Sequence, residues 1–356
     1  MFPRMRNASD LPLINSSDPS FELELHRRQA FYADKASQLP CDLAVLEDAI
    51  NLAEPCSEAR NEFLSSFQRR LRNSCNEAAI VQGVMPKLVP IDDLLDNEPV
   101  ITIPNQQWDK ECSLRIPTTA QYRIPPPKPD QTIGLSASNF SGYENALAYL
   151  AHKARPIKCL PGLTFPLVTV EAKGDRGQNV CRSQNLHNAA VILHQLFRLW
   201  EDTGATSELY YKSLACTISI TTQTCAISHF WLEPSLDASP LVRGRLFKSW
   251  SLNVQDASVL DEIVSSVRNA IYFTINRGIK LITARLEALQ SVLEAIPNPC
   301  CTPSCRKRKF VDREFSDEDL DDSPRPQRLR RIRSTSSRGS SGSRRSSGGR
   351  SCGSWT

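Results

Sequence analysis

The stretch that decides the fold is 164–200, TFPLVTVEAKGDRGQNVCRSQNLHNAAVILHQLFRLW. Its first part, 164–173, begins as a dense run of apolar and β-branched residues, which predicts a strand. Gly174 and Gly177 follow and indicate a turn, and 181–200 carries a broad apolar face at helical spacing. A strand that leads through a turn into a long helix is typical of α/β domains. We therefore expect this strand to lie centrally in a mixed sheet, with the helix packed beside it.

The end of this strand carries the motif on which the functional argument depends. Alternate side chains of a strand point to the same face, so Thr169, Glu171 and Lys173 share one face of the sheet. Glu171 and Lys173 form the only Glu-x-Lys triplet in the sequence, and they place a carboxylate and an ammonium together beside a glycine turn. A solvated ion pair at a strand end, worth at most about 1 kcal/mol, is the alternative interpretation.

A second carboxylate lies upstream at Asp130, 41 residues before Glu171. It follows Pro129 and enters the extended segment 131–136, QTIGLS, so in a small mixed sheet it can lie beside Glu171. Two carboxylates and several water molecules suit Mg²⁺, and such a cation can bind a phosphate and activate water. Lys173 would then orient that water and offset charge in the transition state. A turn or cap role for Asp130 is the alternative.

Further elements are predicted on both sides of this stretch from hydrophobic spacing and from Pro and Gly positions. The predicted helices are 42–53, 57–72, 74–84, 141–153, 257–270 and 274–295. The predicted strands are 98–104, 112–116, 131–136, 213–220, 224–232 and 245–253. The strands 213–220 and 224–232 are expected to form a hairpin, because only three residues separate them.

Three parts of the chain differ in composition. Residues 1–36 are polar without a sustained period, so we expect disorder there. Residues 37–298 are predicted to form one α/β (α+β) domain, a central mixed sheet flanked by helices and preceded by a helical extension. Residues 299–356 form an Arg/Ser-rich tail that cannot build a core.

Composition excludes several classes of protein. The chain has no run of about 18 apolar residues, so no membrane-spanning helix is expected. Its first residues lack the apolar stretch of a secretory signal, and the 12 cysteines are therefore expected to be free thiols. Cys300, Cys301 and Cys305 lack the partners that a zinc site needs.

Three segments together resemble the PD-(D/E)xK nuclease-like superfamily: PKPDQTIGLS, then FPLVTVEAKGDRG, then SQNLHNAAVILHQL. The resemblance covers about residues 75–290. It is closest to an uncharacterised fungal branch, whose proteins carry a long helical lead-in and a polar basic tail. The resemblance implies a restriction-endonuclease-like core. The Pro-rich approach to Asp130 departs from stricter members and puts the position of that residue in its strand in doubt.

The resemblance also implies roles for five residues. Asp130 and Glu171 would be ligands of Mg²⁺ or Mn²⁺, and Lys173 would be the base that positions water. Gln184 would support the site from the following helix. Glu77, in SCNEAAI, would be the carboxylate that the first core helix contributes.

Other residues remain open alternatives. Glu58 and Glu62 are rivals for the role given to Glu77, and Gln184 is equally well an exposed helix residue. His187 and His194 lie seven residues apart on one helix, where a core or interface role is favoured over metal ligation.

The function predicted from these residues is metal-dependent hydrolysis of phosphodiester bonds in nucleic acid, with DNA favoured. The alternative is an inactive nuclease-like module that binds nucleic acid or protein in the nucleus, and the Arg/Ser tail alone suggests a third, an RNA-associated factor. Residues 306–356 hold 14 Lys/Arg and 7 Asp/Glu, a net charge of +7. The basic clusters 306–309 and 328–333 resemble a nuclear import signal, so we expect an import receptor as partner and a nuclear location. A passive solvated tail is the alternative.

Overall fold

The computed structural model describes most of the chain before Ile296. The described residues are 11–34, 38–52, 60–73, 76–90, 100–110, 112–152, 162–174, 177–236, 239–253 and 256–295. The chain divides into two units, Met1–Asn298 and Pro299–Thr356, and all described residues lie in the first unit. The basic tail and Cys300, Cys301 and Cys305 lie outside the described residues.

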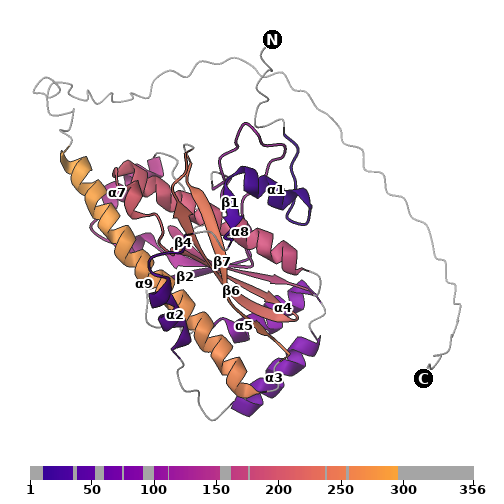
Figure 1. Ribbon diagram of the computed structural model, residues 1–356. Coiled ribbons are helices and arrows are strands. Elements are labelled where there is room, and N and C mark those ends of the chain that lie inside the picture. The colour runs from indigo at the N-terminus through magenta and orange to yellow at the C-terminus, as the bar shows by residue number, and fades with distance from the viewer. Residues whose placement is uncertain are drawn as a thin grey trace, which may run out of the picture. The chain divides into compact units, whose positions relative to one another are not determined.

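A seven-stranded mixed sheet forms the centre of the domain, in the order β1-β7-β6-β5-β4-β3-β2 (Figure 1). The strands are β1 Ala30–Tyr32, β2 Val100–Pro104, β3 Gln131–Leu135, β4 Phe165–Lys173, β5 Ala215–Thr221, β6 Thr224–Glu233 and β7 Leu241–Ser251. The pairs β4/β5 and β1/β7 are parallel and the other pairs antiparallel. The predicted mixed α/β fold is confirmed, and β4 lies inside the sheet as expected.

Helices cover both faces of this sheet. They are α1 Ser20–Arg27, α2 Leu43–Asn51, α3 Arg60–Asn73, α4 Glu77–Gly83, α5 Met85–Leu88, α7 Glu144–His152, α8 Gln178–Asp202 and α9 Ala257–Ala295. On β7, the indole of Trp250 donates to Glu262 of α9 at 3.1 Å, whereas the neighbouring Ser249 shares a cavity with Arg182 of α8. Because neighbouring residues of a strand point to opposite faces, α8 and α9 lie on opposite sides of the sheet.

A bulge in β4 sets which face the functional side chains occupy. Ile133 pairs with Val168 and Gly134 with Pro166, so Leu167 has no partner on β3. A Cβ at Gly278 of α9 would lie 2.3 Å from Leu167 Cδ1, which shows that the leucine fills the space left by this glycine. Beyond the bulge the strand alternates regularly and presents Glu171 to α8.

The expected disorder of residues 1–36 is wrong for the part that the structure describes. Residues 20–27 form α1, and 30–32 form β1, which pairs in parallel with β7. The buried Glu24 contacts Arg27 and Arg28 and accepts a hydrogen bond from the Gln121 backbone at 3.0 Å. Two of these partners lie within one helical turn of Glu24 and the third lies 97 residues away. Polar residues in this segment therefore form buried ion pairs and hydrogen bonds, which its polar composition alone does not predict.

Two other predicted elements differ from the structure. The helices expected at 257–270 and 274–295 are one helix of 39 residues, because the intervening residues 271–273 are large and apolar and contain no helix breaker. The strand expected at 112–116 does not form among the described residues there. Cys112 and Leu114 are nevertheless buried. The alternating apolar and polar residues of 112–116 therefore reflect a loop with alternate side chains buried, not a strand.

No helix within the described ranges has both the length and the apolar composition needed to span a bilayer.

Candidate functional site

Asp130 and Glu171 meet where β3 begins and β4 ends. Gln131 pairs with Val170 across these antiparallel strands, so Asp130, one residue earlier, stands opposite Glu171. The carboxylate of Asp130 accepts a hydrogen bond from the Ala172 backbone N–H at 2.7 Å, which fixes it against β4. The sheet register therefore brings together two carboxylates that are 41 residues apart in sequence.

The ammonium of Lys173 lies among three carboxylates. Its Nζ is 3.1 Å from Glu77 Oε1, 3.6 Å from Asp130 Oδ2 and 3.5 Å from Glu171 Oε2. Glu77 opens α4, where the side chain of Asn76 caps the helix by accepting from the Ala79 N–H at 2.9 Å. Four residues predicted from the sequence thus form one cluster, which we call the acidic–lysine cluster.

Burial distinguishes the members of this cluster. Glu171 is 1% exposed and Asp130 8%, whereas the side chain of Glu77 is 49% exposed and lies at the rim. Burial raises the pKa of Glu171 to about 8, because the loss of hydration outweighs the attraction of Lys173. Burial likewise raises the pKa of Asp130. Burial opposes the charge of Lys173, but Glu171, Asp130 and Glu77 outweigh it and raise the pKa of the lysine, which keeps its positive charge.

Helix α8 supplies a contact that the sequence did not predict. Asn188 Nδ2 donates to Glu171 Oε1 at 2.7 Å, and the Cys181 thiol donates to the Glu171 carbonyl at 3.4 Å. Gln184, one turn before Asn188, has a buried Oε1 that accepts no hydrogen bond from any described residue. The supporting role predicted for Gln184 therefore stays a prediction, and the observed support comes from Asn188. Residues four apart share a helix face, so the sequence places Asn188 on the same side of the helix as Gln184 but does not tell which of the two contacts Glu171.

The donor set fits a hard divalent cation. Glu171 Oε2 is buried and lies 3.5 Å from Lys173 Nζ, but among the described residues it receives no hydrogen bond, so this oxygen of a desolvated carboxylate has room for a further positive partner. Within the described part of the chain, no group of three or more His, Cys, Asp or Glu side chains is already arranged around a metal position. Mg²⁺ needs only one or two protein carboxylates and keeps several waters, so Asp130 and Glu171 are sufficient in number and kind.

The other candidate residues are placed as follows. Glu58 and the side chain of Glu62 lie outside the described residues. His187 is buried and packs edge-on against Phe21 at 5.7 Å between ring centroids, and burial lowers its pKa to about 3. Burial also lowers the pKa of His194 to about 4. Both histidines are thus neutral at pH 7, His187 in the core and His194 at a half-buried position. The five described cysteines are free thiols, as predicted: Cys41, Cys112, Cys181, Cys216 and Cys225.

Together the fold and the site define a class: a mixed α/β protein with a buried acidic–lysine cluster at the end of an inner strand. The chain belongs to the family described as "Domain of unknown function (DUF7924)", whose model matches residues 63–291. This segment contains every residue of the cluster and excludes α1 and β1. No curated protein matches the chain.

Proposed function

We propose that this protein is a metal-dependent nuclease of the PD-(D/E)xK nuclease-like superfamily, which hydrolyses phosphodiester bonds of nucleic acid, with DNA favoured. The observation that supports the proposal is the convergence of Asp130, Glu171 and Glu77 on Lys173, with one buried oxygen of Glu171 left without a hydrogen bond. A solvated ion pair at a strand end would be exposed to water, whereas Glu171 is 1% exposed.

Each residue of the cluster has a distinct role in this proposal. Asp130 and Glu171 hold Mg²⁺ or Mn²⁺, which when bound supplies electrostatic polarisation of the phosphate. Lys173 orients the attacking water and offsets negative charge that develops on the phosphate. Asn188 fixes the orientation of Glu171 through its hydrogen bond to Oε1. Glu77, at the exposed rim, contributes a further carboxylate through water.

The second candidate is an inactive module that binds nucleic acid or protein through the same scaffold. The observation that favours it is that all three carboxylates already lie within ion-pair distance of Lys173, so the cluster is partly neutralised without a metal. The two candidates differ in metal binding, because only the nuclease requires Mg²⁺ or Mn²⁺ at Asp130 and Glu171.

Cleavage assays with a lysine variant test the proposal. Purified protein is incubated with single- and double-stranded DNA and RNA in Mg²⁺, in Mn²⁺ and in EDTA. We expect cleavage that requires the metal and that Lys173→Ala reduces by about 10²–10³-fold, the usual effect of removing a group that stabilises the transition state. Lys280→Ala is the control, because it removes an exposed lysine of α9 away from the cluster. The nuclease proposal is rejected if Lys173→Ala cleaves as fast as the wild type, or if the wild type shows no cleavage.

We also propose that the tail directs the protein to the nucleus. The clusters 306–309 and 328–333 provide the positive charge that import receptors bind. We expect a chain truncated after Asn298 to lose nuclear accumulation while its thermal unfolding stays unchanged. A truncated chain that still accumulates in the nucleus contradicts this assignment.

A further inference from the structure

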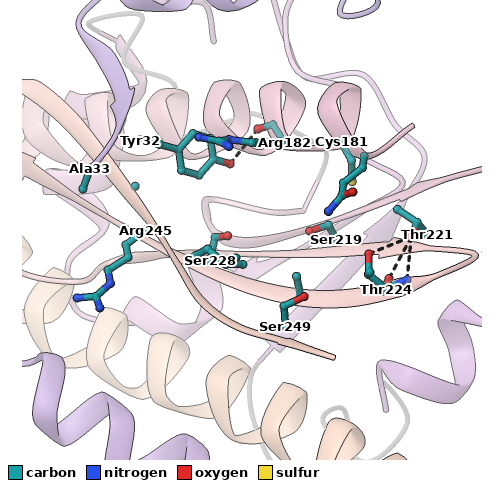
Figure 2. Close-up of a pocket in the computed structure, with 14 residues that line it drawn as sticks. Tyr32, Ala33, Cys181, Arg182, Ser219, Thr221, Thr224, Ser228, Arg245 and Ser249 are labelled. Atoms are coloured by element: carbon teal, nitrogen blue, oxygen red, sulfur yellow. Dashed lines mark hydrogen bonds between the residues drawn. The ribbon is translucent and has the colours of Figure 1, made fainter. Parts of the chain in front are cut away.

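A cavity of about 310 Å³ lies next to the acidic–lysine cluster, between α8 and the strands β5, β6 and β7 (Figure 2). Five of its lining residues carry hydroxyl groups on the strands: Ser219, Thr221, Thr224, Ser228 and Ser249. Arg182 of α8 and Tyr32 of β1 form the opposite side. We call this space the hydroxyl cavity.

The hydroxyl cavity adjoins the cluster directly. In the parallel pair β4/β5, Ser219 is the partner of Glu171, and Thr221 is the partner of Lys173. Paired residues of neighbouring strands point to the same face, about 4.8 Å apart. A chain molecule with one group at Lys173 can therefore place its next group in the hydroxyl cavity.

The arginine and the hydroxyl groups of the lining suit a ligand that has both a negative charge and several hydrogen-bonding groups. Among the described residues that line it, none is Asp or Glu. The guanidinium of Arg182 lies 4.1 Å from the centroid of the Tyr32 ring, and the Tyr32 hydroxyl donates to the Arg182 carbonyl at 2.9 Å. No carboxylate of the described residues forms an ion pair with Arg182. The guanidinium, which stacks on Tyr32, is therefore available to bind an anionic group of a ligand.

The size of the cavity selects among nucleic acids. A volume of about 310 Å³ is that of a pocket for one small ligand, not of a groove along which a duplex could lie. A base pair within a duplex cannot enter such a space, whereas one nucleotide out of the stack can. The volume also falls within the usual range for small-ligand pockets, about 300–1,000 Å³.

We propose that the hydroxyl cavity binds one unpaired nucleotide of the substrate strand, with its phosphate on Arg182 and its sugar and base against the hydroxyl groups of β5, β6 and β7. The substrate class is then nucleic acid with an unpaired nucleotide beside the cleaved bond, as in single strands, flaps or frayed ends. This inference rests on the proposed nuclease function for the bond placed at Lys173, but nucleotide binding itself does not require cleavage.

Binding in EDTA tests the cavity separately from the chemistry. Fluorescence anisotropy compares the affinity of the full-length protein for a labelled ten-nucleotide oligo(dT) and for a blunt hairpin duplex. We expect the single strand to bind at least tenfold more tightly, and Arg182→Gln to remove about tenfold of that affinity. The matched control is Arg72→Gln, which removes the same charge from an exposed side chain of α3 that does not line the cavity. The basic tail contributes equally to both variants.

Two further variants separate recognition from folding. Arg182→Lys keeps the positive charge and should retain most of the single-strand affinity. Ser249→Tyr fills the cavity from an exposed position and should block the single strand, with unfolding temperatures unchanged in both variants. Equal binding of single strand and duplex by the wild type, or equal losses in Arg182→Gln and Arg72→Gln, overturns the inference.

The binding test and the cleavage assay can fail independently of each other. If no cleavage is found but Arg182 still selects single strands, the nuclease proposal fails and the hydroxyl cavity stands. If Lys173→Ala abolishes cleavage but Arg182→Gln binds the single strand as tightly as Arg72→Gln does, the nuclease stands and the cavity assignment fails.

Discussion

Glu24 of α1 and Glu171 of β4 are both buried carboxylates, but their surroundings differ. Glu24 is 0% exposed and contacts Arg27 and Arg28, and it accepts a hydrogen bond from a backbone N–H at 3.0 Å. Burial would raise its pKa, but the hydrogen bonds from Arg28, from the Gln121 backbone and from Arg27 outweigh burial, and the pKa lies below its ordinary value.

Glu171 has fewer partners at similar burial. It shares a single lysine with two other carboxylates, one oxygen receives no hydrogen bond from the described residues, and its pKa is raised to about 8. Breaking up a buried carboxylate that has a full set of partners is costly, whereas a buried carboxylate left short of partners costs stability and is typical of a functional site. The comparison therefore favours a structural role for Glu24 and supports the functional role proposed for Glu171.

The largest expected effect is on the structural side. Glu24→Gln leaves Arg28, whose side chain is 2% exposed, without its buried counter-charge. Removing one partner of a buried pair costs about 3–5 kcal/mol, so we expect urea unfolding at pH 7 to show a loss of that size. A loss below about 1 kcal/mol would remove the distinction between the two carboxylates.

Glu171→Gln is expected to raise the free energy of unfolding, whereas Glu24→Gln lowers it. Since the folded pKa near 8 exceeds the ordinary value of 4.5, the folded protein keeps a proton that the unfolded chain loses between pH 4.5 and 8. Stability supplied by this group is therefore present below pH 4.5 and lost as the pH rises through 8. The difference between pKa values of 4.5 and about 8 corresponds to at most about 5 kcal/mol, so we expect Glu171→Gln to stabilise the metal-free protein at pH 8.5 by more than about 2 kcal/mol.

The pH dependence provides the control for this variant. The gain from Glu171→Gln should disappear at pH 4.5, where the wild-type carboxyl is protonated in the folded protein. Equal unfolding free energies of variant and wild type at both pH values would show that Glu171 is not destabilised by its surroundings.

A smaller effect is expected at Asn188, which holds the orientation of Glu171. Asn188→Ala removes the 2.7 Å hydrogen bond and should weaken Mn²⁺ binding about tenfold, as is usual for groups behind a metal ligand. Gln184→Ala is the comparison, because the buried Oε1 of Gln184 accepts no hydrogen bond from any described residue. If Gln184→Ala weakens Mn²⁺ binding more than Asn188→Ala does, the assignment of the two residues is reversed.

Local patterns predicted the inner part of the fold and three members of the cluster, whereas the fourth, Glu77, was implied by the family resemblance. Alternation placed Glu171 and Lys173 on one face, and the start of β3 placed Asp130 beside them. Long-range pairing was not available from local patterns, so the parallel pairing of β1 with β7 was missed. The Asn188 contact depends on how α8 rotates against β4, which helical spacing alone leaves open.

The central claim is that Asp130 and Glu171 hold a divalent cation, and calorimetric titration of the full-length protein with Mn²⁺ tests it most directly. We predict one bound Mn²⁺ per chain, with an affinity that falls at least tenfold in Asp130→Asn and is unchanged in Asp256→Asn, whose carboxylate lies at the exposed start of α9. A wild-type protein that binds no Mn²⁺, or an Asp130→Asn variant that binds it as tightly as the wild type, would contradict the account.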